Sequence, residues 1–206
     1  MDNKKQYDKI EFSKFKFYED GTGFECTVDA DDHEKEDIIF FRFNKPIGRI
    51  SNNLVFAALM TLVGKDWYKN AYFDLSISSH VYENAKNASN TNIEVKDVNF
   101  EEDIGKRDSY SGVSLNLSGG IDSNALYHLL KRGEVEFHPI GTDFGQSYAR
   151  DLDVFKDRVD LILRTNVRDS ATKYVSDQKT WNFMGIASLL SVDYYKTKFI
   201  LFGQVN

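Results

Sequence analysis

The sequence predicts an α/β protein with a parallel sheet in its C-terminal part, preceded by a small domain that is α+β or mostly β. The first observation is that short apolar runs alternate with helical patterns from Val113 onwards, which is typical of a parallel sheet. The second is that apolar and polar side chains alternate between residues 9 and 43, around a turn signal at Glu19–Gly23, which is typical of a β-hairpin. Because the charged stretch Glu101–Ser111 separates the two patterns, we predict domains over residues 1–107 and 108–206, the first of unknown role.

The composition disfavours several classes of protein. The chain has 206 residues and a formal net charge of −6, which argues against generic binding to nucleic acids or membranes. Its single cysteine, Cys26, excludes a disulfide framework within the chain and a multi-cysteine zinc site, and we interpret it as a packed strand residue. Because the N-terminus lacks an apolar signal core and no apolar run approaches membrane-spanning length, we expect a cytoplasmic protein.

The N-terminal domain is predicted to be strands around one main helix. This helix runs from a cap at Asn52 or Asn53 to a stop at Gly64. The acidic run Asp29–Asp37 is interpreted as a solvated loop, and a metal site built from its carboxylates is the alternative. Strands are predicted at Ile10–Phe17, Phe24–Val28, Ile38–Phe43, Ala71–Ser79 and Ile93–Val98, with a loop or short helix at His80–Thr91.

The C-terminal domain is predicted to alternate strands with helices. The apolar side chains of the first helix repeat at Ala125, Leu126, Leu129 and Leu130, which predicts that this face is buried. Gly203 follows the last strand and is expected at the carboxyl edge of the sheet, where ligands bind in such folds. The predicted strands are Val113–Leu117, Val135–Thr142, Asp160–Leu163 and Phe199–Phe202, and the predicted helices are Asn124–Arg132, Ser147–Val159 and Trp181–Tyr194.

The loop that joins the first of these strands to its helix has the sequence SGGIDS. A strand, a tight loop and a helix together point free backbone N–H groups at an anion. Gly119 and Gly120 leave no side chain between the backbone and a phosphate, while Ser118 and Ser123 add hydroxyl donors. Asp122 would repel a phosphate, so we interpret it as a helix cap or as a Mg²⁺ ligand. The loop lacks the lysine of a Walker sequence.

SGGIDS resembles the SGGxDS loop of the N-type ATP pyrophosphatases, which include asparagine, GMP and argininosuccinate synthetases. The resemblance implies an adenine nucleotide alpha hydrolase-like fold, ATP and Mg²⁺ as ligands, and adenylation of a carboxylate or amide oxygen with release of pyrophosphate. A nitrogen nucleophile would then displace AMP. It implies that Ser118, Gly119, Gly120, Asp122 and Ser123 bind the phosphates, with Asp122 and Ser123 catalytic and Asp122 also the metal ligand.

A second segment indicates which member of this family the chain resembles most. Asp143, Gly145 and Gln146, in the sequence DFGQ, resemble the D-Y-G-Q segment of 7-cyano-7-deazaguanine synthase, with Phe144 in place of the tyrosine. These residues follow the second strand and are expected to line the adenosine or substrate side of the same crevice, together with Gly203. Arg164 and Arg168 could reach phosphates from the third strand, and solvated loop arginines are the alternative.

The chain departs from that enzyme in two ways. It has only Cys26, so we expect no zinc site, and it ends at Asn206, before the fifth strand of the family fold. We therefore expect a truncated chain, or a homodimer or partner protein that completes the site and covers the exposed sheet edge. The alternative function is a non-catalytic nucleotide-binding subunit of a larger assembly, such as a defence or nucleic-acid-modification complex. The small-molecule substrate and the nucleophile stay open.

Overall fold

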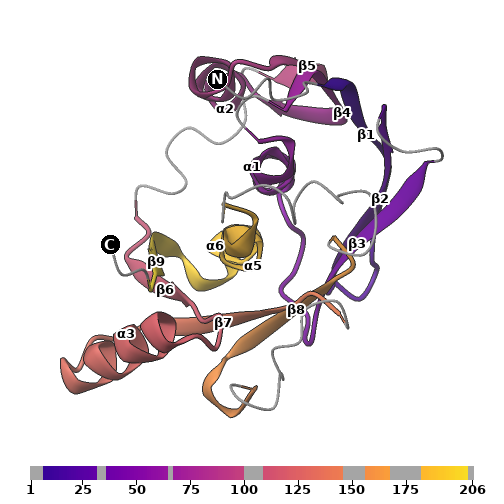
Figure 1. Ribbon diagram of the computed structural model, residues 1–206. Coiled ribbons are helices and arrows are strands. Elements are labelled where there is room, and N and C mark those ends of the chain that lie inside the picture. Colours follow the sequence, from indigo (N-terminus) through magenta and orange to yellow (C-terminus); the bar gives the residue numbers. More distant parts are fainter. Residues whose placement is uncertain are drawn as a thin grey trace.

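Residues 7–31, 36–64, 67–99, 109–145, 156–167 and 182–203 are described by a computed structural model, which is an α/β structure (Figure 1). They form one nine-stranded mixed sheet with the order β5-β4-β1-β2-β3-β8-β7-β6-β9. The strands are β1 (Tyr7–Phe17), β2 (Gly23–Ala30), β3 (Asp37–Phe43), β4 (Tyr68–Ser78), β5 (Asn92–Asn99), β6 (Gly112–Asn116), β7 (His138–Asp143), β8 (Leu161–Thr165) and β9 (Thr197–Phe202). The α-helices are α1 (Asn52–Val63), α2 (Ser79–Ala88), α3 (Ile121–Arg132), α5 (Ile186–Leu190) and α6 (Val192–Tyr195), and the 3₁₀ helices are η2 (Lys156–Arg158) and η3 (Asn182–Gly185).

The predicted N-terminal hairpin is confirmed. Strands β1, β2 and β3 pair in antiparallel fashion, while β4 and β5 extend the sheet beside β1 in parallel. The alternation in β1 buries Ile10 and Phe12, as the period of a strand requires. Cys26 is buried in β2, and burial raises the pKa of its thiol, so this residue is packed as expected.

The first helix of the chain is capped by a different residue from those predicted. The side chain of Ser51 accepts a hydrogen bond from the Leu54 amide, so Ser51, not Asn52 or Asn53, is the N-cap of α1. The two asparagines instead tie α1 to β4. Asn52 donates to the Ser76 carbonyl at 3.0 Å, and Asn53 accepts from the Ser78 amide at 2.9 Å.

The N-terminal and C-terminal strands belong to one sheet because β3 pairs in antiparallel fashion with β8. Asn166 extends this pairing, since its side chain accepts from the Phe40 amide at 2.9 Å and donates to the Ile38 carbonyl at 2.8 Å. A single hydrophobic cluster includes Phe41 of β3 and Leu163 of β8. The predicted domain boundary at residues 107 and 108 lies outside the described residues and stays a prediction.

Strands β8, β7, β6 and β9 are parallel and lie in that order, which is third, second, first and fourth along the C-terminal part. The sheet curves around α1, α5 and α6, whereas α3 lies on its other face (Figure 1). The order reverses between β6 and β9. Such a reversal opens a crevice at the carboxyl ends of the two strands, because their connections leave toward opposite faces.

Two predicted helices differ from the structure. Helix α3 begins at Ile121, and its buried residues are Ser123 and Tyr127, while Ala125 and Leu129 are exposed. The prediction of the buried face is therefore wrong at two of its four positions. The other two, Leu126 and Leu130, pack against the small cluster of Leu115, Leu117 and Tyr127.

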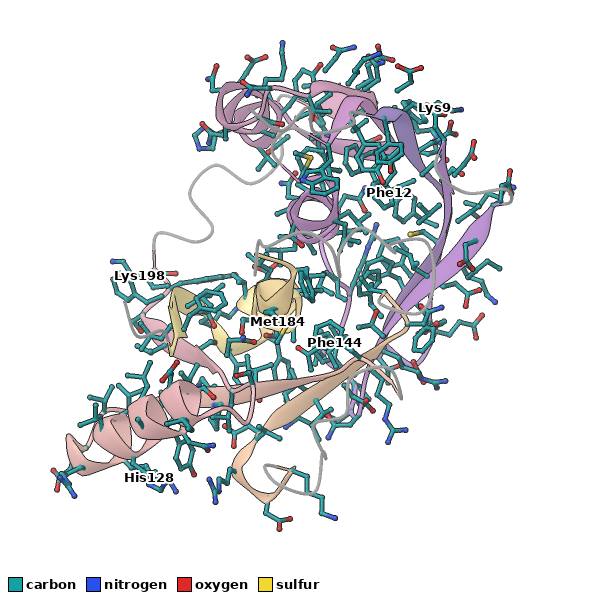
Figure 2. All side chains as sticks on the ribbon, viewed as in Figure 1. Lys9, Phe12, His128, Phe144, Met184 and Lys198 are labelled. Atoms are coloured by element: carbon teal, nitrogen blue, oxygen red, sulfur yellow. The ribbon has the colours of Figure 1, made fainter. Side chains whose placement is uncertain are left out.

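The helix predicted at Trp181–Tyr194 is broken, within the described part, into η3, α5 and α6. The prediction of which of its residues are buried is nevertheless correct in part. Phe183, Ala187 and Leu190 are buried in the main core, whereas Tyr194 is exposed. Met184 of η3 and Phe144, both labelled in Figure 2, belong to this core. No helix within the described ranges is both long enough and apolar enough to cross a membrane.

Candidate functional site

The SGGIDS loop lies where β6 ends and α3 begins. Gly119 has φ 73°, a left-handed conformation that glycine adopts without strain. Gly120 is the N-cap of α3 in extended conformation, and it supplies no side-chain cap. The first N–H groups of a helix have no partner within it, and N–H groups of this kind bind anions at helix N-termini.

The two serines of the loop contact each other. The Oγ atoms of Ser118 and Ser123 are 3.2 Å apart, and Ser123 Oγ also donates to the Gly120 carbonyl at 3.1 Å. Ser123 is 2% exposed, whereas Ser118 is half-buried. Ser123 therefore holds the loop in its bent form, and Ser118 is the more accessible of the two hydroxyls.

Asp122 is not the cap of α3. It lies in the first turn of the helix, one residue beyond Ile121, and the N-cap is Gly120. Among the described residues its carboxylate forms no hydrogen bond or ion pair, although a negative charge is favoured at this end of a helix. The half-buried carboxylate of Asp122 is an oxygen ligand of the kind that Mg²⁺ prefers, and the Mg²⁺ interpretation of this residue stays a prediction.

Gly203 lies directly against the start of α3. A Cβ added to Gly203 would be 2.4 Å from the Ser123 nitrogen and 2.5 Å from the Asp122 carbonyl carbon. The backbone at Gly203, directly after β9, therefore touches the backbone of the first turn of α3. Only glycine permits so close an approach. This contact places Gly203 beside the SGGIDS loop, at the carboxyl ends of β6 and β9.

The second predicted segment lies at the end of the neighbouring strand. Asp143 ends β7, and its carboxylate accepts from the Gly145 amide at 3.0 Å and pairs with Arg164 at 3.4 Å. Arg164 is thus engaged with Asp143. Phe144 is buried and contacts Phe183, so it is a core residue. Of the predicted residues, Gln146 and Arg168 lie outside the described ranges.

A cationic side chain that the sequence did not single out lies beside the loop. Arg158 of η2 donates from Nη1 to Asn124 Oδ1 at 2.9 Å, and Asn124 Nδ2 donates to the Gly119 carbonyl at 3.1 Å. Asn124 therefore links Arg158 to the glycine that shapes the loop. Among the described residues this guanidinium has no carboxylate partner, so its charge is available to an anion.

Within the described part of the chain, the site therefore combines a helix N-terminus, two hydroxyls, a carboxylate without an ion pair and an adjacent arginine. In proteins, helix N-termini bind anions and carboxylate and hydroxyl oxygens bind metal ions. His128 is exposed on the outer side of α3, away from this loop (Figure 2).

No protein-family model matches the chain, and no curated protein or solved structure is significantly similar to it. The functional interpretation therefore depends on the residues and geometry described above.

Proposed function

We propose that this protein binds MgATP and cleaves it to AMP and pyrophosphate while activating a carboxylate or amide oxygen. The observation that carries the proposal is the SGGIDS loop at the carboxyl end of β6, beside β9, with Gly203 packed against Ser123 of the loop. The order of β8, β7, β6 and β9 further supports an adenine nucleotide alpha hydrolase-like fold for this part of the chain.

The proposed roles follow from the positions of the groups. The N–H groups at the start of α3, with Ser118 and Ser123, bind the β- and γ-phosphates, which leave as pyrophosphate. Asp143 and Gly145 at the end of β7 line the adenosine or substrate side of the crevice. Asp122 would hold Mg²⁺, which neutralises phosphate charge when it is bound.

The proposed chemistry has two steps. An oxygen of the acceptor attacks the α-phosphorus of ATP, the bond to the bridging oxygen breaks, and pyrophosphate carries away the electron pair. A nitrogen nucleophile then attacks the activated carbon and displaces AMP. The protein contributes positioning and donors for the leaving pyrophosphate, because little covalent chemistry falls to its side chains.

The products of ATP cleavage test this proposal. With ATP labelled at the α-phosphate, we expect slow formation of labelled AMP with water as the acceptor, and none of ADP. Replacing Ser118 with alanine should lower the rate roughly 100- to 1,000-fold, since removal of one such donor costs about this much in other enzymes. Formation of ADP and phosphate, or an unchanged rate in Ser118→Ala, would contradict the proposal.

Arg158 is expected to strengthen pyrophosphate binding. Replacing it with alanine should weaken the affinity about fivefold, because an exposed charge contact contributes up to about 1 kcal/mol. The loss should shrink as salt is added, since salt screens exposed charges. Arg132→Ala is the control: Arg132 lies in the last turn of α3, at the end opposite to the loop, and its substitution should leave the affinity unchanged. An equal effect of both substitutions would mean that only net charge matters.

The alternative is a nucleotide-binding subunit of a larger assembly. Strand β9 ends the described sheet and pairs only with β6 within it. Large apolar side chains of α3 and β9 are exposed: Ile121 at 89% and Leu129 at 63% on α3, and Phe199 at 56% on β9. An uncovered strand edge with apolar neighbours favours association with another chain. Binding of MgATP without any AMP formation would favour this alternative.

A further inference from the structure

Asn116, the last residue of β6, is a buried polar residue that the proposed mechanism does not use. Its exposed fraction is 6%, and its side chain forms no hydrogen bond with any described residue. Ser114, two positions earlier on the strand, is also buried, but its hydroxyl lies 2.6 Å from that of Thr197. No carboxamide atom of Asn116 is among the fully buried unpaired atoms of the described residues, so this largely buried side chain reaches the surface with its hydrogen-bonding capacity unused there.

The neighbours of Asn116 define where a ligand that contacts its side chain would lie. Leu115 and Leu117 pack in the cluster beneath α3, so the alternation of a strand places Asn116 on the opposite face, toward α5. In register with Asn116 are Ile140 of β7 and Phe202 of β9. Asn116 therefore lies at the carboxyl edge of the sheet, between two neighbouring strands, on the face opposite to α3.

Two further groups on this face suit a planar heterocycle. Phe202 is 48% exposed, and the end of its ring lies against Gly185, so the uncovered part of the ring is available for stacking. Thr142, two residues after Ile140 and therefore on the same face of β7, has a buried hydroxyl without a hydrogen-bond partner. The face thus offers an aromatic surface beside unpaired polar groups, next to the strand end from which the SGGIDS loop departs.

We propose that Asn116 recognises the adenine ring of the bound nucleotide, with Phe202 as the surface on which the ring stacks. This inference rests on the proposed function, since it concerns the nucleotide at that same site. A carboxamide pairs with adenine because it donates to N7 and accepts from N6, whereas guanine presents acceptors at both N7 and O6. Asn116 is therefore the residue that sets the preference for ATP over GTP.

The test is calorimetric titration of the protein with MgATP, MgGTP and pyrophosphate. Asn116→Leu keeps the size of the side chain but removes both hydrogen bonds, so it should weaken MgATP binding roughly 10- to 100-fold. It should also abolish the preference for ATP over GTP. Pyrophosphate affinity should stay unchanged, which shows at the same time that the variant is folded.

Two further variants sharpen the result. Asn116→Asp keeps the shape but cannot donate to N7, so it should also lose MgATP affinity while retaining pyrophosphate binding. Ser114→Ala is the matched control on the same strand and face, and it should bind all three ligands as the wild type does. If both Asn116 variants bind pyrophosphate and still prefer ATP to GTP, the inference is overturned and the proposed function stands. If the wild type binds none of the three ligands, both are overturned.

Discussion

Replacing Gly203 with alanine is expected to displace the first turn of α3 and to abolish most of the affinity for pyrophosphate and MgATP. The added Cβ would lie 2.4 Å from the Ser123 nitrogen and 2.5 Å from the Ser123 Cα. Both are backbone atoms, so no side-chain rotation relieves the contact, and either β9 or α3 must move. Overpacking of this kind costs about 1–3 kcal/mol, which corresponds to roughly 5- to 150-fold in affinity.

Calorimetric titration together with thermal unfolding measures this effect. Gly133→Ala is the matched control because Gly133 ends the same helix, and its added Cβ comes no closer than 3.4 Å to another atom. We expect that control to bind pyrophosphate normally. If Gly203→Ala binds as tightly as the wild type, the contact between β9 and α3 does not shape the site.

Replacing Gly119 with alanine is expected to produce the second large effect. Gly119 has φ 73°, a conformation that costs an L-residue roughly 1–2 kcal/mol. The loop would relieve this strain by rotating, and the N–H groups that face the ligand would then rotate with it. We expect pyrophosphate affinity to fall at least about tenfold, in addition to a loss of stability of roughly 1–2 kcal/mol.

The variant Gly48→Ala distinguishes a loss of pyrophosphate affinity caused by the loop from one caused by lower stability. Gly48 has φ 84° and no atom within 4 Å of its added Cβ, and it lies in the segment between β3 and α1. Its substitution should therefore lower the free energy of unfolding by a similar amount and leave pyrophosphate binding intact. Equal losses of affinity in the two variants would show that the effect comes from general destabilisation, not from the loop.

Local patterns were sufficient to predict the strand, the loop and the helix around SGGIDS. Glycines, serines and the apolar run before them are contiguous in sequence, and each acts on its own backbone. The boundaries were less accurate: α3 begins at Ile121, inside the predicted loop, because Gly120 serves as its N-cap. The buried face of α3 was partly wrong because its packing centres on Tyr127 and leaves Leu129 in solvent.

Contacts between distant parts of the chain were not predictable in the same way. The position of Gly203 followed from the rule that parallel strands end at one edge, but its contact with Ser123 did not. The pairing of β3 with β8 uses backbone groups, which carry no residue signal, so the continuous sheet was not expected. Likewise, nothing in the sequence joins Arg158 to Asn124, because only the fold brings η2 to the start of α3.

Calorimetric titration of the wild-type protein with pyrophosphate and, separately, with MgATP shows whether the SGGIDS loop binds phosphates. We expect both ligands to bind at one site and pyrophosphate to compete with MgATP, because both use the start of α3. Absence of binding by either ligand would contradict the claim that the SGGIDS loop is a phosphate site in this protein.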